Sequence, residues 1–129
     1  MARAMLTLRY KPLWIVASVV LVLGVIWGSL QTKYGVHAPL GFDKVEHVST
    51  YMFMAVWFTG IVHRPRYWAA ALTLLALGLA LEITQWAMHA GRQGDPYDMA
   101  ANTVGVLAGT ALALALTGGW AQRVEAWLK

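Results

Sequence analysis

The sequence contains no cysteine. That absence excludes disulfide bonds, thiolate metal sites and cysteine nucleophiles. Charged residues are also scarce, at 12% of the 129 residues, and they stand between apolar runs rather than along one face of amphipathic helices. Hydrophobic residues make up 59% of the chain, compared with roughly 45–50% in soluble domains. A water-soluble fold of this size could not bury so much apolar surface, so the composition predicts a membrane protein.

Signatures of nucleic-acid binding and of several enzyme classes are missing as well. The ten Lys and Arg residues give a formal charge of +4, but they are scattered and form no basic stripe of the kind that binds nucleic acid. The sequence has no serine in a nucleophile-elbow motif and no glycine-rich phosphate loop. We therefore expect no nucleic-acid partner and no cofactor.

Four apolar segments predict helices that cross a membrane. The first, residues 13–30, contains 18 residues without a charge, which is about 27 Å of helix against a hydrocarbon core of roughly 30 Å. The others are expected at residues 43–62, 67–89 and 96–116, with a short amphipathic tail at 119–129. Short linkers favour antiparallel neighbours. The predicted fold is an all-α membrane protein, a single domain over residues 1–129 built as an antiparallel four-transmembrane-helix bundle.

The distribution of basic residues predicts the orientation. If the N-terminus lies inside, the inner face holds seven of the ten: Arg3, Arg9, Lys11, Arg64, Arg66, Arg123 and Lys129. The outer face then holds Lys33, Lys44 and Arg92. Since basic residues favour the cytoplasmic side, both termini are expected in the cytoplasm.

Polar side chains gather at the opposite face, on three of the predicted helices. At helical spacing these are Asp43, His47 and Tyr51 on the second helix, Glu82, Gln85 and His89 on the third, and Asp98 and Asn102 on the fourth. We expect the three stripes to meet at one depth and form a ligand site, with Lys44 and Arg92 at its rim.

Two glycines on the fourth helix continue its polar stripe toward the membrane interior. Gly105 and Gly109 have the small-x-x-x-small spacing that allows helices to approach closely. Their face predicts a tight helix contact, and it is also the candidate surface for a homo-oligomer.

Glu82 has two interpretations. It lies about two turns, or roughly 10 Å, below the outer end of its helix, where a carboxyl costs at least ~2.5 kcal/mol unless it is paired, protonated or hydrated. It either clamps the bundle by bonding His47, Asn102 or Tyr51, or it serves a ligand or a reaction. We favour the functional interpretation, because several costly groups at one depth exceed what a single clamp requires.

The acidic residues at helix starts also have a structural interpretation. Asp95, Pro96 and Asp98 fit a helix start, with Asp95 as the N-cap and an acid in the first turn. Asp43 could cap the second helix in the same way.

Metal binding is a further alternative. His47, Glu82, His89 and Asp98 carry nitrogen and oxygen atoms suited to zinc or manganese. Their spacing shows no His-Glu-x-x-His-type signature, so we expect no metal, and these four residues are the candidates if one binds.

Taken together, the motifs resemble a known family. Asp43-Lys44-x-x-His47-x-x-x-Tyr51, Glu82-x-x-Gln85, Arg92 and Asp98-x-x-x-Asn102-x-x-Gly105-x-x-x-Gly109 are similar to the signature of VanZ-like membrane proteins, over roughly residues 42–116. The family is named for a protein that gives bacteria low-level resistance to the glycopeptide teicoplanin. The resemblance implies a bacterial envelope protein with a shared polar site. Combined with the orientation expected from the basic residues, it predicts a multi-pass protein of the cytoplasmic membrane with the polar site on the extracytoplasmic side.

The favoured functional hypothesis combines this resemblance with the depth of the site. The protein would bind or remodel a lipid or lipid-linked cell-wall molecule, with a link to teicoplanin resistance, and Lys44 and Arg92 would contact a phosphate. One alternative is an intramembrane enzyme in which Glu82 or Asp98 forms an acid/base pair with His47. The other is a purely structural or partner-binding bundle.

Overall fold

The computed structural model describes residues 4–31, 41–88 and 95–129, and this part of the chain is helical. Its elements are α1 (Lys11–Leu30), α2 (Phe42–Ile61), the 3-10 turn η1 (Arg64–Arg66), α3 (Tyr67–Met88), α4 (Pro96–Leu112), the π-helical turn η2 (Ala113–Thr117) and α5 (Trp120–Trp127). These ranges contain no β-strand, only an isolated bridge between Met5 and Val62. The all-α prediction is confirmed.

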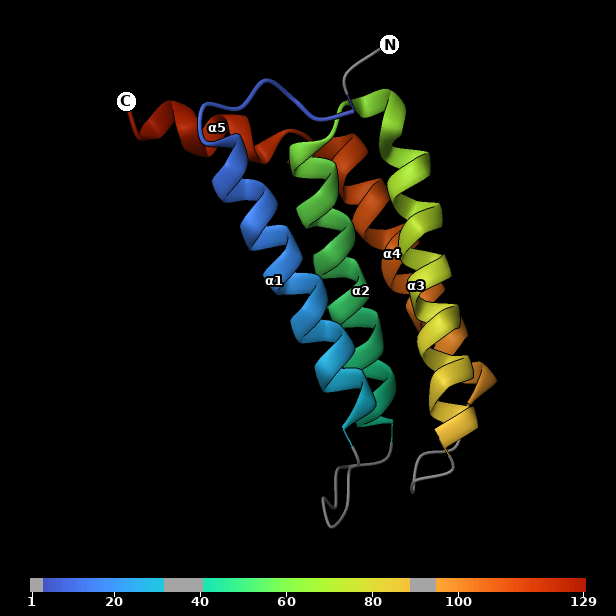
Figure 1. Cartoon of the computed structure of the whole chain (residues 1–129). Coiled ribbons are helices and arrows are strands. Elements are labelled where there is room, and N and C mark those ends of the chain that lie inside the picture. The colour runs from blue at the N-terminus through green and yellow to red at the C-terminus, as the bar shows by residue number, and fades with distance from the viewer. Residues whose placement is uncertain (1–3, 32–40, 89–94) are drawn as a thin grey trace.

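The four long helices lie side by side, and successive helices run in opposite directions (Figure 1). α5 lies across the end of the bundle where α1 begins and α4 ends. This topology brings the start of α2, the end of α3 and the start of α4 to the same end, which is where the predicted polar residues lie.

Among the described residues, three helical segments are long and apolar enough to cross a membrane: Lys11–Leu30, Arg64–Met88 and Pro96–Thr117. α2 is not among them, because its first five residues include Asp43, Lys44 and Glu46. The apolar side chains of α1 are exposed or half-buried, and Ser18 is its one buried residue, as expected for a helix surrounded by lipid. The chain is therefore a membrane protein, while a fourth crossing by α2 stays a prediction.

The close contact predicted for the two glycines is confirmed, and α2 is the partner. A Cβ atom added to Gly105 would lie 2.4 Å from the backbone oxygen of Val48, and one added to Gly109 would lie 2.6 Å from the backbone oxygen of Met52. The backbones of α2 and α4 can approach this closely only because both residues lack a side chain. The glycine face thus serves a contact within the chain, and a homo-oligomer through it stays a prediction.

At the opposite end of the bundle, Glu125 joins α5 to the start of α1. Its carboxylate accepts hydrogen bonds from the backbone N–H of Arg9 at 2.7 Å and of Tyr10 at 2.9 Å, and from the Trp14 indole at 2.7 Å. Burial alone would raise the pKa of Glu125, but these donors favour the charged form and lower it overall. The sequence analysis assigned Glu125 no role, since its partners lie more than a hundred residues away.

Three tryptophans pack beside this carboxylate. Trp14, Trp57 and Trp120 lie with ring centroids 5.3–5.9 Å apart in each pair. Gly60 makes room for the cluster, because a Cβ atom there would lie 1.9 Å from the Trp120 indole nitrogen. The end of the bundle that is remote from the polar site is therefore fixed by aromatic packing around one carboxylate.

Candidate functional site

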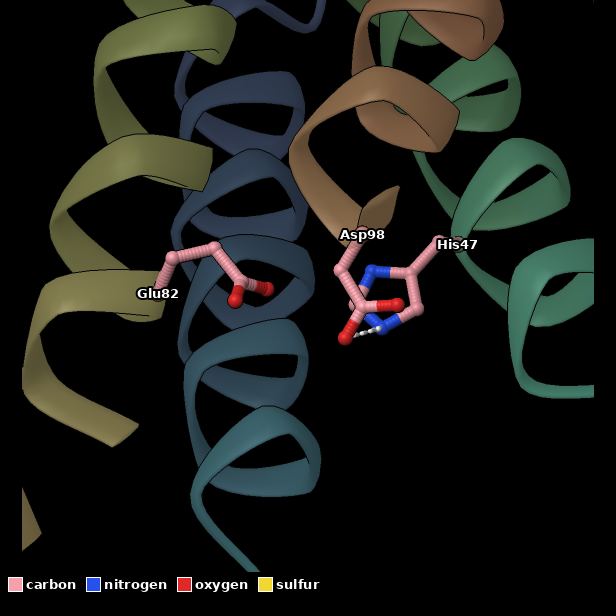
Figure 2. Close-up of side chains that lie close together, drawn as sticks. All are labelled: His47, Glu82 and Asp98. Atoms are coloured by element: carbon pink, nitrogen blue, oxygen red, sulfur yellow. Dashed lines mark ion pairs between the residues drawn. The ribbon is translucent and has the colours of Figure 1, made fainter. Parts of the chain in front are cut away.

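Three helices deliver His47, Glu82 and Asp98 to one place. His47 lies on α2, Glu82 on α3 and Asp98 on α4, and their side chains point toward one another (Figure 2). One ligand atom from each residue lies within 4.8 Å of the others. Glu82 and Asp98 are each 8% exposed. The sequence prediction placed these residues at one depth, and the structure brings them together.

The start of α4 follows the predicted cap. Asp95 is the N-cap, its side chain accepts a hydrogen bond from the Tyr97 N–H at 2.9 Å, and Pro96 occupies the first turn. This geometry places Asp98 in the first turn of the helix, facing the bundle. Asp98 is thus both an acid at a helix N-terminus and a member of the site.

The start of α2 corrects the prediction that Asp43 caps this helix. The N-cap is Gly41, with φ of 83° and no side-chain cap. A glycine adopts this left-handed conformation without strain, so the chain enters the helix two residues before Asp43. Asp43 lies in the first turn, and its side chain is 50% exposed.

Lys44 is surrounded by three carboxylates. Its ammonium group donates hydrogen bonds to Asp43 at 2.8 Å, to Asp95 at 2.8 Å and to Asp98. The bond from Lys44, together with the Tyr97 N–H, holds the pKa of Asp95 below its ordinary value. All three N–H groups of the ammonium have partners, so a phosphate could reach Lys44 only by displacing a carboxylate.

His47 is oriented by Asn102. The Nδ1 atom of His47 lies 2.8 Å from the Asn102 side-chain oxygen. An amide oxygen can only accept a hydrogen bond, so Nδ1 carries the proton and donates. The other ring nitrogen, Nε2, faces the Asp98 carboxylate at 3.5 Å. Asn102 is 1% exposed, and its buried amide therefore fixes which edge of the imidazole faces the acids.

Glu82 does not form the clamp that the structural interpretation proposed. Within the described part of the chain, the hydrogen bond that reaches its carboxylate comes from the Asp95 N–H, at 3.3 Å. His47, Asn102 and Tyr51 do not hydrogen-bond to it in these ranges. A carboxylate that is 8% exposed thus has one long hydrogen bond from the backbone.

Gln85 and Tyr51 support the site from its sides. Gln85 donates to the backbone oxygen of Ser29 at 2.7 Å and so ties α3 to α1. Tyr51 is 3% exposed and lies in the core of the bundle. Both predicted positions adjoin the site, while Arg92 and His89 fall outside the described residues.

The sequence analysis missed Gly78, one helical turn before Glu82. A Cβ atom there would lie 3.0 Å from the Asn102 amide nitrogen and 3.2 Å from the Tyr51 hydroxyl. The glycine lets α3 approach these two buried side chains. The sequence spacing indicates this position, because Gly78 lies four residues before Glu82 and therefore on the same face of the helix.

The sequence matches one protein family over most of its length. The family model of VanZ/LLP1 matches residues 8–117, a range that holds α1 to α4 and every described residue of the site. The chain belongs to the VanZ/LLP1 family. Comparisons with curated proteins and with solved structures gave no significant match. Membership of the VanZ/LLP1 family confirms the resemblance seen in the motifs and agrees with a membrane protein.

Proposed function

We propose that this VanZ/LLP1 protein binds an amphiphilic membrane molecule, a lipid or lipid-linked cell-wall precursor, with the head group at the polar site. The observation that carries the proposal is a groove of about 360 Å³ between α1 and the neighbouring helices. Its two sides differ in polarity, as the two parts of an amphiphile do.

The groove has a largely apolar side on α1 and a polar side on α2 and α3. The α1 side is formed by Val20, Leu21, Gly24, Val25, Gly28 and Ser29. The polar side is formed by Glu46, His47, Thr50, Tyr51 and Gln85. His47 belongs to both the groove and the acidic site, so a ligand in the groove would reach the acids. Binding sites commonly combine an apolar lining with a few convergent polar groups of this kind.

The acidic site favours particular head-group chemistry. Glu82 and Asp98 accept hydrogen bonds, and hydroxyl or amine groups of a sugar or peptide donate them. Lys44 is engaged by carboxylates, so the positive charge needed for a phosphate has to come from another source. A polar head group of this kind is consistent with a lipid-linked cell-wall molecule, and the VanZ/LLP1 family supports a role in the bacterial envelope, with teicoplanin resistance as the phenotype to measure.

Gly28→Leu should abolish lipid retention without unfolding the protein. Nothing lies within 4 Å of a Cβ atom at Gly28, so leucine would fill the groove rather than clash with the backbone. We expect native mass spectrometry with lipid extraction to find a reproducible species with the wild type. The variant should lose at least nine-tenths of that species.

Val19→Leu is the matched control, because Val19 lies on α1 but does not line the groove and is 52% exposed. It should keep the species at the wild-type level. The proposal is wrong if the wild type carries no reproducible lipid, or if Gly28→Leu carries as much as Val19→Leu.

The same proposal places the polar site on the extracytoplasmic side. Since the sequence has no cysteine, single cysteines report the topology without background. In intact cells, Tyr97→Cys at the polar end should react with a membrane-impermeant thiol reagent, whereas Arg66→Cys at the other end should react only after lysis. Both residues are exposed in the structure. The reverse pattern would overturn the orientation.

A further inference from the structure

The cluster of His47, Glu82 and Asp98 can offer a metal ion one imidazole nitrogen and two carboxylate oxygens. Each offers one atom within 4.8 Å of the other two. Bonds of about 2.1 Å to a tetrahedral ion separate ligand atoms by roughly 3.4 Å. The Nε2 atom of His47 and the Asp98 carboxylate, at 3.5 Å, already meet that spacing. The ligand atom of Glu82 lies within 4.8 Å of a ligand atom of each.

The hydrogen bond from His47 to Asn102 prepares the ring for an ion. Because Nδ1 donates to the Asn102 oxygen at 2.8 Å, Nε2 is the ring nitrogen that faces Asp98 and that would hold an ion. Metal-binding histidines usually donate their other ring N–H to a carbonyl or carboxylate in this way. Asn102 is 1% exposed and cannot easily turn away.

Glu82 supplies a separate observation in favour of a cation. It is 8% exposed, and its carboxylate points at His47 and Asp98 (Figure 2). Among the residues the structure describes, only the Asp95 N–H reaches it, at 3.3 Å, through one of its two oxygens. Its other oxygen accepts no hydrogen bond from the described residues, and a cation between the three side chains would satisfy it.

Lys44 does not contact Glu82. Its ammonium pairs with Asp43, Asp95 and Asp98, and so reaches one member of the cluster from the rim side. The second acidic group, Asp43 with Asp95 and Asp98, already contains this lysine. Within the described residues, Glu82 is the member of the cluster that has no ion pair.

We propose that His47, Glu82 and Asp98 bind one divalent transition-metal ion, zinc or manganese, positioned by Asn102. One imidazole nitrogen and two carboxylates suit both ions. The three ligands come from α2, α3 and α4, so the ion would also join these helices. This departs from the expectation of no metal, because sequence spacing alone could not show that the three side chains point at each other.

Metal binding does not depend on the proposed lipid ligand, because it can be measured with no lipid present. One consequence does rest on the proposed function. An ion at this position would provide the positive charge for a phosphate head group that Lys44 cannot provide. If the protein binds the metal ion but no lipid, the proposed function is wrong and the proposed metal site is still supported.

The experiment measures metal content and thermal stability of the purified full-length protein in detergent. Protein prepared without chelator should contain about one equivalent of zinc or manganese by mass spectrometry of the elements. After treatment with a chelator, adding Zn²⁺ or Mn²⁺ should raise the melting temperature of the wild type, as a ligand of the folded state does.

Two ligand variants and one control test the assignment. Glu82→Gln and His47→Ala should weaken Zn²⁺ or Mn²⁺ binding by at least tenfold, and Asn102→Ala by about tenfold to a hundredfold through loss of ring orientation. His63→Ala removes a histidine that lies next to η1, at the other end of the bundle, and should bind as the wild type does. Circular dichroism of each variant shows that it is folded.

Two results would overturn the site. In the first, the wild type takes up neither ion at micromolar concentration. Alternatively, folded Glu82→Gln and His47→Ala could bind Zn²⁺ and Mn²⁺ as tightly as His63→Ala, in which case the ion binds elsewhere.

Discussion

Gly105→Leu should destabilise the protein by about 3 kcal/mol or more, the upper range for forcing a larger side chain into a packed interior. A Cβ atom at this position would lie 2.4 Å from the Val48 backbone oxygen and 3.0 Å from the Met52 backbone nitrogen. Backbone atoms of a helix cannot move aside as a side chain can, so α2 and α4 must separate. Thermal unfolding in detergent measures the loss.

A pair of alanine variants controls for helix propensity. Alanine is favoured over glycine in a helix by about 1 kcal/mol. Nothing lies within 4 Å of a Cβ atom at Gly24, so Gly24→Ala should leave the melting temperature unchanged or raise it. Gly105→Ala should lower it despite the same gain in propensity. Equal responses of the two variants would show that the contact between α2 and α4 does not govern stability.

Glu82→Gln should abolish the function of the site while the fold stays intact or becomes more stable. Glutamine keeps an oxygen for the Asp95 N–H and removes a buried charge that has one long hydrogen bond. Stability gained in exchange for lost function is typical of functional sites. Lipid retention and metal content of the variant report function, and thermal unfolding of the chelator-treated proteins reports stability, so that loss of the ion does not itself lower the melting temperature.

Glu125→Gln is the matched control, since it makes the same change at the other end of the bundle. The Glu125 carboxylate accepts three hydrogen bonds, two from backbone N–H groups and one from Trp14. Losing the charge weakens these bonds, so this variant should melt at a lower temperature and still retain lipid and metal. Glu82→Gln should therefore lower lipid and metal retention without lowering stability, and Glu125→Gln should lower stability without lowering retention.

Three results for Glu82→Gln separate the interpretations of this residue. Full retention of lipid and metal would remove Glu82 from the site. Failure to fold would favour the structural bundle. If the protein is an intramembrane enzyme, Glu82→Gln would still bind the lipid but would no longer convert it, because binding and proton transfer are separate steps.

Much of the fold could be predicted from apolar runs and helical spacing. α3 and α4 begin at the predicted residues, Tyr67 and Pro96, because proline and basic residues end one helix and proline begins another. The cap at Asp95 was predicted from the same local chemistry. α2 was predicted less well: its start is a left-handed turn at Gly41, and its charged first turn removes it from the helices apolar enough to span.

The residues of the site were predicted from the sequence, but the contacts between them were not. The helical repeat places Asp43, His47 and Tyr51 on one stripe of α2. It does not show that Asp43 bonds the lysine beside it, while His47 turns to Asn102. The carboxylates that Lys44 contacts depend on how each helix is rotated about its axis. That rotation is set by contacts between helices, such as those of Gly105 with α2.

The sequence by itself determined the helices, the membrane environment, and the depth at which the polar residues lie, because these depend on local hydropathy and helical repeat. Only the tertiary structure decided that Lys44 faces three acids, that Glu82 faces His47 and Asp98, and that Glu125 holds the start of α1. These contacts join residues far apart in the chain. Their geometry follows from the packing of helix against helix, which no periodicity within a single helix records.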